Sequence, residues 1–204
     1  TPGLTRRIEA ALGARVVASA PLALGFGLHG AEVRLEDGRR LAVKARPPRA
    51  QGQSLALEGF MLEELARLSA LPVPRVHYAA DDLLAMDFIE TDGSGIGASA
   101  ERHAGELIAA LHAAPRPRFG YARDTSIGPL AQPNPESARW VPFFRDHRLL
   151  HMARAAHAEG ALPASLLARI ERFAAGLEDR LVEPAHPALL HGDLWTGNVL
   201  VRGG

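Results

Sequence analysis

Cysteine is missing from this chain of 204 residues, which excludes disulfide bonds, thiolate metal sites and thiol redox switches within it. Excess charge is missing too: 23 basic residues balance 23 acidic ones, so nothing favours a nucleic acid or an anionic membrane as a partner. No apolar run is long enough to cross a bilayer, and no signal-peptide pattern opens the sequence. With 47% hydrophobic and 23% charged residues, we expect a soluble, cytoplasmic, globular protein.

Lysine is almost absent as well. Lys44 is the single lysine, beside 22 arginines. In a sequence so biased toward arginine, a position that needs only positive charge becomes arginine. We therefore expect position 44 to require a compact ammonium on a flexible side chain. The alternative is that one lysine has remained by chance.

The segment that leads to Lys44 has the pattern of a glycine-rich β-hairpin. The stretch LALGFGLHGAEVRLEDGRRLAVKA predicts a strand, a loop with Gly25, Gly27 and Gly30, a second strand, a turn at 37–38 and a third strand. Such a loop can bring backbone N–H groups close to phosphate oxygens, with a lysine on the next strand in reach of them. Ordinary turns and bulges are the alternative explanation of these glycines.

The next segment, residues 51–69, has helical periodicity. With about 3.6 residues per turn, its apolar stripe consists of Leu55, Glu58, Leu62, Leu65 and Ser69. Glu58 is thus a carboxylate within the apolar face, where an unpaired charge is costly. Either Lys44 pairs with it, or Glu58 lies at the edge of the face and reaches water.

The remaining pattern predicts an α+β protein with two domains. Residues 71–79 and 83–90 read as two short strands joined by a turn, and 91–99 is a connector rich in glycine and serine. We therefore expect a β-rich domain over 1–90 and a mostly helical domain over 91–204. Within the second domain the sequence predicts helices over 100–114, 139–159 and 163–182, and an irregular, proline-rich region over 115–137.

The stretch LLHGDLWTGNVL, residues 189–200, places four functional side chain types between two apolar runs that read as buried strands. These side chains are His191, Asp193, Trp195 and Asn198. No second ligand cluster completes a metal site with His191 and Asp193, and no G-x-S-x-G motif supplies a serine nucleophile. The pattern H-x-D-x-x-x-x-N instead fits phosphoryl transfer, in which an aspartate deprotonates the attacking hydroxyl and an asparagine holds Mg²⁺.

Together these motifs resemble the fructosamine kinase (ketosamine 3-kinase) family, relatives of the aminoglycoside phosphotransferases. The resemblance spans nearly the whole chain. It is carried by LAVK at 41–44, LALEGFMLEEL at 55–65, AMDFIE at 85–90, IGPLAQPN at 127–134, WVPFFRDHRL at 140–149 and HGDLWTGNVL at 191–200. The motif H-G-D with its asparagine is shared by many small-molecule kinases, whereas the L-W pair that follows H-G-D is specific to far fewer of them.

The resemblance implies a protein-kinase-like fold of two lobes with ATP between them. Its nucleotide site would use Lys44 for the α- and β-phosphates, Glu58 to hold that lysine, and Gly25, Gly27 and Gly30 for the loop above the phosphates. The backbone of Asp87, Phe88 and Ile89 would contact adenine, Asp193 would be the catalytic base and Asn198 would coordinate Mg²⁺.

The same resemblance implies the phosphorylation of the 3-hydroxyl of a ketoamine on a glycated amine or protein. Gln132, Asn134, Trp140 and Trp195 are the candidate substrate residues, although Trp195 could equally be a core residue between the lobes. Two alternatives stay open. The protein could phosphorylate an aminoglycoside or an amino alcohol, or it could be a kinase-like module that binds nucleotide without catalysis.

The sequence departs from the family at two places. The family begins its phosphate loop with adjacent glycines, whereas this chain has GFGLHG at 25–30. No aspartate follows Asp193, although the family has a second, metal-binding aspartate downstream of the catalytic loop. We therefore expect the sequence to be part of a longer protein and, as written, to be deficient in catalysis.

Overall fold

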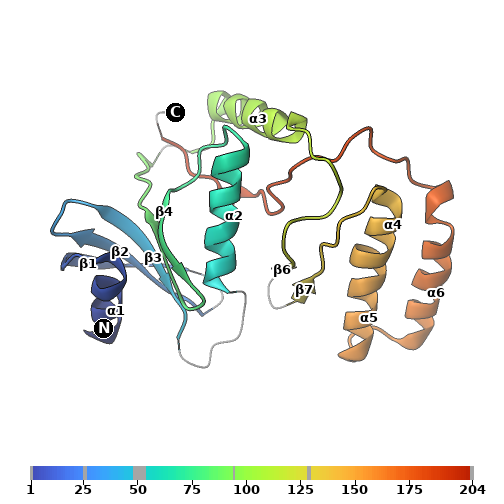
Figure 1. Ribbon diagram of the computed structural model, residues 1–204, viewed down its shortest axis with the longest axis horizontal. Coiled ribbons are helices and arrows are strands. Elements are labelled where there is room, and N and C mark those ends of the chain that lie inside the picture. Colours follow the sequence, from blue (N-terminus) through green and yellow to red (C-terminus); the bar gives the residue numbers. More distant parts are fainter. Residues whose placement is uncertain (1, 25–26, 48–53, 94, 128–129, 203–204) are drawn as a thin grey trace. The chain divides into compact units, whose positions relative to one another are not determined.

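The computed structural model describes residues 2–24, 27–47, 54–93, 95–127 and 130–202 (Figure 1). Gly25, one of the three glycines of the predicted phosphate loop, lies outside these ranges. The chain divides into two compact units: one consists of Thr1–Ala113 and Leu190–Gly204, the other of Ala114–Leu189. The two-domain boundary expected after residue 90 stays a prediction.

The first unit is built on a five-stranded antiparallel sheet. Its strands are β1 (Val16–Leu22), β2 (His29–Leu35), β3 (Arg40–Ala45), β4 (Val76–Ala80) and β5 (Leu83–Asp87), in the order β1-β2-β3-β5-β4. The predicted hairpin is confirmed, because β2 and β3 pair on either side of the turn at 37–38. Gly38 has a φ of 87°, a conformation that a residue with a Cβ rarely adopts. The two strands predicted on either side of 81–82 are also confirmed, as β4 and β5.

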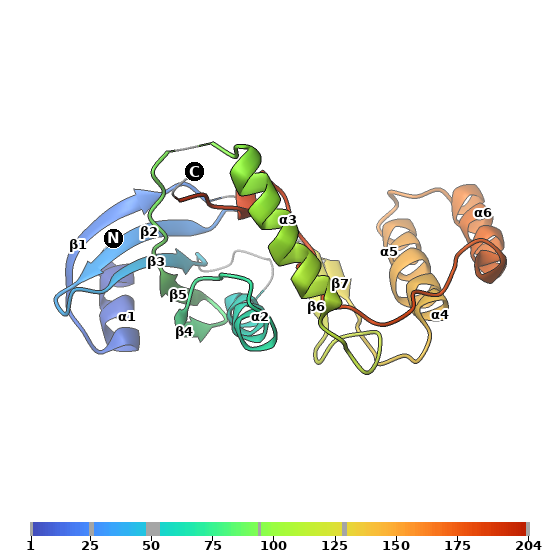
Figure 2. The ribbon, with the colours of Figure 1, turned by 90° about the horizontal axis from the view of Figure 1, so that it is seen from above.

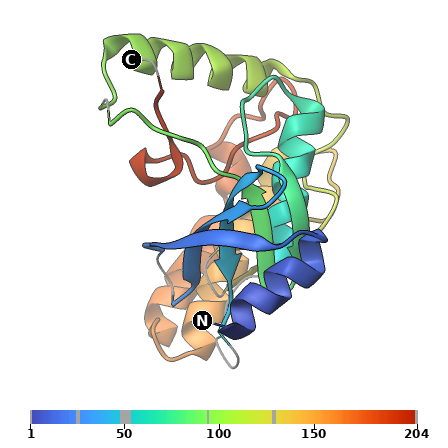
Figure 3. The same ribbon diagram turned by 90° about the vertical axis from the view of Figure 1, so that its left-hand side faces the viewer.

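One face of the sheet is covered by α1 (Pro2–Leu12), which contacts β1 and β4 (Figure 3). Ile8 of this helix lies in a cluster of buried side chains from β2, β3 and β5, which are Ala31, Val33, Leu35, Leu41, Val43, Ala45, Leu83 and Ala85. The sequence analysis missed α1, although Leu4, Ile8 and Leu12 recur at the spacing of one helical face.

The opposite face, at the β4 and β5 end of the sheet, carries α2 (Leu55–Leu68) (Figure 2). Ser54 caps the helix, because its side chain accepts a hydrogen bond from the Leu57 N–H and donates one to Asp81. Gly59 lets the helix approach the sheet closely, since a Cβ there would lie 2.5 Å from the Cβ of Ala79. The helix predicted over 51–69 is confirmed from residue 55, and residues 51–53 lie outside the described ranges.

The first unit ends with α3 (Ala98–Ala113) and the segment from Leu190, which contains a short 3₁₀ turn at Thr196–Asn198. The helix predicted over 100–114 is thereby confirmed. The prediction that buried strands flank the polar motif is wrong, although Leu189 itself is buried. Leu190 and Leu200 are 62% and 60% exposed, and no strand among the described residues pairs with 199–202. An apolar run forms a strand only where a neighbouring strand satisfies its backbone, and the described part of the chain offers none to residues 199–202.

The second unit contains a two-stranded hairpin and two helical runs. The hairpin pairs β6 (Thr125–Ile127) with β7 (Leu130–Gln132), in a region expected to be irregular. The first helical run comprises α4 (Trp140–Phe144), a π-helical segment (Arg145–Leu150) and α5 (His151–Ala158), so the helix expected over 139–159 is confirmed apart from its π-helical centre. The second, α6 (Ala164–Ala175), stops at Gly176, short of the predicted residue 182, because glycine is a poor helix former.

Among the described residues, no helix has the combination of length and apolar character that a membrane span requires.

Candidate active site

Lys44 and Glu58 form the ion pair that the helical periodicity suggested. The Lys44 Nζ donates a hydrogen bond of 2.5 Å to the Glu58 Oε1. The strand register places Lys44 opposite Leu84, on the face that carries α2, and the cap at Ser54 places Glu58 in the first turns of that helix. Both side chains keep about a quarter of their surface exposed, at 25% and 29%. The ammonium is therefore fixed in position and still accessible to a ligand.

Two of the predicted phosphate-loop glycines have conformational reasons to be glycine. Gly27 has a φ of 69°, in the left-handed region that a side chain disfavours. Gly30 pairs directly with Lys44 across β2 and β3, and a Cβ on it would lie 2.5 Å from the Leu22 carbonyl oxygen on β1. Gly30 therefore lies in β2 rather than in the predicted loop, and the strand pairing brings it next to the lysine.

Asp87, at the end of β5, and the next two residues were predicted to contact adenine, and two of their three N–H groups are already engaged. The Asp87 N–H donates to the Arg75 carbonyl at 2.9 Å, and the Phe88 N–H donates to the Arg40 carbonyl at 3.1 Å. Within the described part of the chain the N–H of Ile89 has no acceptor. The Asp87 carboxylate lies 2.7 Å from the His77 Nε2.

Asp193 and Asn198 meet in the predicted catalytic loop. The Asn198 Nδ2 donates to the Asp193 side-chain Oδ2 and to its backbone oxygen, both at 2.8 Å. Gly192 has a φ of 87°, which turns the chain between His191 and Asp193, and the Asp193 N–H lies 3.4 Å from the His191 Nδ1. The 3₁₀ turn that ends at Asn198 brings the two side chains together. Asp193 remains exposed.

The side-chain oxygen atoms of this loop are suitable ligands for a hard cation. With the Asn198 amide nitrogen turned toward Asp193, the Asn198 Oδ1 and the Asp193 Oδ1 have no hydrogen-bond partner in the described structure. Magnesium prefers such oxygen ligands, and it usually takes only one or two from protein and the rest from phosphates and water. No group of three or more His, Cys, Asp or Glu side chains within the described ranges could hold a metal ion by itself.

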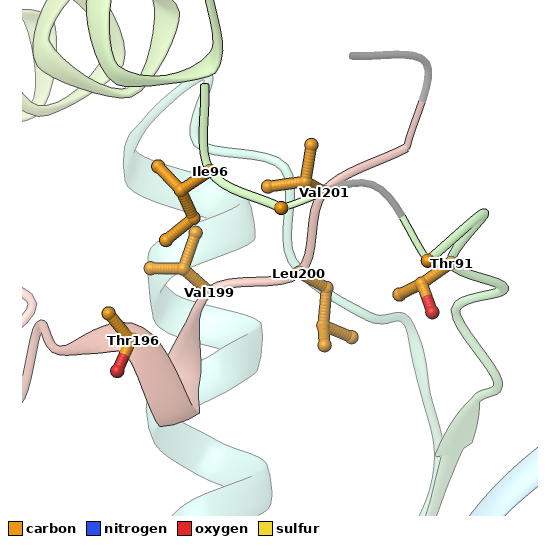
Figure 4. Close-up of a pocket in the computed structure, with 8 residues that line it drawn as sticks. Thr91, Ile96, Thr196, Val199, Leu200 and Val201 are labelled. Atoms are coloured by element: carbon orange, nitrogen blue, oxygen red, sulfur yellow. The ribbon is translucent and has the colours of Figure 1, made fainter. Parts of the chain in front are cut away.

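Trp195 is 61% exposed in this loop, so its ring is not a core residue of the first unit. The ring lies over Gly197, where any Cβ would collide with it. An open hollow of about 470 Å³ adjoins the same loop (Figure 4). Its lining is mostly apolar and consists of Thr91, Gly93, Gly95, Ile96, Thr196, Val199, Leu200 and Val201.

The other three predicted substrate residues belong to the second unit. Asn134 is 5% exposed, and its amide nitrogen donates to the Arg123 carbonyl and to the Thr125 hydroxyl. Its amide oxygen accepts from Arg148, whose burial lowers the pKa of its guanidinium. Through these hydrogen bonds Asn134 stabilises the segment around β6 and β7.

Gln132 and Trp140 are each anchored within the same unit. The Gln132 Oε1 accepts from the Thr125 hydroxyl at 2.9 Å. The ring of Trp140 stacks on that of Phe144, with 5.1 Å between the ring centres. The backbone N–H of Trp140 donates to the Glu183 carboxylate at 2.7 Å. A role of Asn134, Gln132 or Trp140 in binding substrate stays a prediction.

Arg40 is a charged residue that was not predicted to belong to the site, and it contacts Glu32 and Glu90. The hydrogen bond from Arg40 holds the pKa of the Glu32 carboxyl below its usual range. The hydrogen bonds to Glu32 and, to a smaller extent, to Glu90 raise the pKa of Arg40 itself. The signal was present in the sequence, because Arg40 precedes Lys44 by two strand repeats and therefore shares its face of the sheet.

Known proteins that are similar to this chain include one family model and several kinases named for ketoamines or ribulosamines. A family model described as fructosamine kinase matches residues 8–203. A probable ketoamine kinase from Synechocystis is 36% identical over 156 residues, which cover 72% of this chain and 50% of the relative. The protein-ribulosamine 3-kinase of Arabidopsis thaliana is 32% identical over 163 residues, covering 75% of this chain and 47% of the relative. The chain thus spans about half the length of these curated relatives.

Solved structures agree on the fold. A candidate fructosamine-3-kinase from Thermobifida fusca matches with a TM-score of 0.83 and 31% identity, covering 100% of this chain and 70% of the other. A macrolide 2'-phosphotransferase from Brachybacterium faecium matches with a TM-score of 0.59 and 22% identity, covering 100% and 68%, a likeness of fold alone. The predicted α+β, protein-kinase-like fold is confirmed.

Proposed function

Because the chain belongs to the fructosamine kinase family, we propose that the whole protein transfers the γ-phosphoryl group of ATP to the 3-hydroxyl of a ketoamine. The observation that carries the proposal is the pairing of Asp193 with Asn198 in a glycine-turned loop, in a unit that also contains the Lys44–Glu58 ion pair. These are the side chains that phosphoryl transfer needs for a base, a metal ligand and a phosphate ligand.

The nucleotide would be held by the first unit. Lys44 binds the α- and β-phosphates, and Glu58 keeps its ammonium directed at them. Gly27, in the loop before β2, and Gly30, in β2 itself, are proposed to lie over the phosphates together with Gly25. Of the hinge residues Asp87, Phe88 and Ile89, the last offers its N–H to the adenine ring, because the first two have donated theirs within the sheet.

The transfer step requires a base beside the acceptor hydroxyl. The oxygen of the ketoamine 3-hydroxyl attacks the γ-phosphorus while its proton passes to a carboxylate oxygen of Asp193. The bond from the γ-phosphorus to the β–γ bridging oxygen breaks, and ADP leaves with that oxygen. Asn198 orients the carboxylate through its 2.8 Å hydrogen bond and turns its own amide oxygen toward the metal position. Mg²⁺, when bound there, neutralises charge on the phosphates.

The substrate class follows from the relatives, which bear the names ketoamine kinase and protein-ribulosamine 3-kinase. Trp195 is an exposed aromatic beside the catalytic base, suited to contact a sugar, and Gln132, Asn134 and Trp140 are further proposed substrate residues. A phosphoester on the 3-hydroxyl lets the adduct decompose and frees the amine. We place this ATP-dependent reaction in the cytoplasm, with residues 1–90 as the nucleotide lobe and 91–204 as the helical lobe.

The test is an assay of the full-length protein with ATP and Mg²⁺ against fructosyl-lysine, ribosyl-lysine and an aminoglycoside. We expect phosphate on the 3-hydroxyl of the ketoamines, located by NMR, and a fall in turnover of about a hundredfold or more in Asp193→Asn. Phosphorylation of the aminoglycoside alone would identify a different phosphotransferase. Absence of turnover with every acceptor would identify a non-catalytic module.

A further inference from the structure

Arg40 occupies the centre of a charged cluster at the start of β3. Its Nε donates to the Glu32 Oε1 at 2.6 Å, and its Nη1 donates to the Glu90 Oε1 at 2.9 Å. The guanidinium also lies over the ring of Phe88, 4.2 Å from the ring centre. One side chain thus contacts β2 and two residues of the segment that follows β5.

The strand register places this cluster on the face of the sheet that carries Lys44. Alternate residues of a strand share a face, so Arg40, Ala42 and Lys44 point the same way. Glu32 lies directly opposite Ala42 in the β2–β3 pairing and therefore shares that face as well. The side chains of Arg40 and Glu32 are partly buried, at 33% and 20% exposed.

The contacts of Arg40 fall on both neighbours of Ile89. On one side the Arg40 carbonyl accepts the Phe88 N–H at 3.1 Å, while the guanidinium covers the Phe88 ring. On the other side the guanidinium binds the Glu90 carboxylate. Ile89, between them, has an N–H with no acceptor in the described structure, as does Glu90 after it.

We propose that Arg40 is a positioning residue for the nucleotide base, which holds residues 88 and 90 so that the Ile89 N–H is presented to the base before it binds. The inference rests on the proposed kinase function. A segment that is already ordered loses less conformational freedom on binding, so the effect belongs to nucleotide affinity. The phosphates and the acceptor hydroxyl contact other residues, so turnover at saturating ATP is unaffected.

The matched control is Arg34, which lies opposite Arg40 in the β2–β3 register and is exposed. Arg34→Gln removes the same charge from the same face without touching the hinge. Arg40→Lys keeps the charge of Arg40. A single ammonium, however, cannot replace a planar guanidinium that binds two carboxylates and stacks on a ring. Glu90→Gln weakens only the contact on the C-terminal side of Ile89.

The experiment measures the dissociation constants of ADP and ATP, and the KM for ATP and kcat with a ketoamine, in the full-length protein and these variants. We expect Arg40→Gln to raise the nucleotide constants and the KM for ATP by about tenfold, or about 1.4 kcal/mol, with kcat unchanged. Glu90→Gln should raise them by a smaller factor, Arg40→Lys should restore them only partly, and Arg34→Gln should leave them as in the wild type.

Three results would overturn the inference. Unchanged nucleotide affinity in both Arg40→Gln and Glu90→Gln would show that the cluster does not position the hinge. An equal loss of nucleotide affinity in Arg34→Gln would show that the loss comes from the change in net charge and not from the contacts of Arg40. A fall in kcat together with the thermal unfolding temperature, at unchanged affinity, would assign Arg40 a purely structural role. A wild-type protein that binds no nucleotide would instead overturn the proposed function, and this inference with it.

Discussion

Among single side chains, the Lys44–Glu58 pair shows how a local pattern and a long-range contact combine. Periodicity placed a carboxylate within the apolar stripe of a helix and left open whether it was paired or reached water. The structure shows both, since Glu58 binds Lys44 and still keeps 29% of its side chain exposed. A partly exposed pair adds little stability, so its value lies in where it holds the ammonium.

Lys44→Arg should therefore impair activity although it preserves the charge. The guanidinium is larger and planar, and it cannot place one compact donor both on the Glu58 Oε1 and on a phosphate. We expect kcat/KM for ATP in the full-length protein to fall by about a hundredfold, the order found when one preorganised donor is lost. Steady-state kinetics check this, with Arg172→Lys on α6 as the reciprocal control. Wild-type kcat/KM in Lys44→Arg would contradict the role of the ammonium.

Asn134 makes the opposite point about single residues. Its position in a motif suggested contact with substrate, but its amide is buried and donates to Arg123 and Thr125 while it accepts from Arg148. A buried amide is satisfied by whatever polar groups surround it, and only the folded chain identifies them.

At the scale of elements, the position of Glu58 depends on how closely α2 packs against the sheet. Gly59 is buried next to Ala79 and Leu84, and the cap at Ser54 fixes the start of the helix. A glycine inside a helix normally weakens it, so this one serves the close approach of helix and sheet.

Gly59→Ala should thus damage both stability and activity despite the higher helix propensity of alanine. The added methyl would lie 2.5 Å from the Ala79 Cβ and 3.3 Å from the Leu84 Cδ1, so α2 must move outward and carry Glu58 with it. We expect a loss of about 1–3 kcal/mol in the free energy of unfolding, and a lower kcat/KM for ATP.

Gly105→Ala on α3 is the control for this substitution. A Cβ at Gly105 meets nothing within 4 Å, so the change should raise stability by up to about 1 kcal/mol and leave the kinetics unaltered. Urea unfolding and steady-state kinetics of both variants decide the matter. A Gly59→Ala protein as stable and active as Gly105→Ala would show that the close approach is not required.

Across the whole molecule, hydrogen bonds from arginine lower the pKa of the Glu32, Asp37 and Asp146 carboxyls. Arg40 acts on Glu32 and Arg39 on Asp37 in the first unit, and Arg145 acts on Asp146 in the second. A carboxyl whose pKa is lower in the folded state contributes stability that is present above its unfolded pKa and is lost as the pH falls through its folded pKa.

Both units should therefore lose stability in acid. We expect urea unfolding to give a nearly constant free energy down to about pH 5 and a decline below about pH 4, where these carboxyls take up protons. Glu32→Gln should flatten the decline in the first unit, and Asp146→Asn in the second. Added salt should reduce the same decline, because the side chains of these pairs keep part of their surface exposed to solvent. A free energy of unfolding independent of pH between 3 and 5 would contradict the role of these pairs.

Features encoded by local chemistry could be predicted from the sequence alone. The hairpin turn at 37–38, the helices expected over 51–69 and 100–114, the need of Glu58 for a partner or for water, and the motif around Asp193 all follow from periodicity, turn residues and spacing. Each depends on residues close in the chain, or on one buried charge that needs a partner. The same motifs indicated the family to which the chain belongs.

Features that depend on residues distant in the chain could be learned only from the folded protein. It showed that Leu190 and Leu200 are exposed rather than buried in strands, and that Arg40 joins Glu32 to residues 88 and 90. An apolar run has the same sequence whether or not a neighbouring strand pairs with it. An arginine likewise has the same sequence signature whichever of many carboxylates it binds. The partner is chosen by the packing of the sheet, which brings together residues separated by 50 positions in the chain.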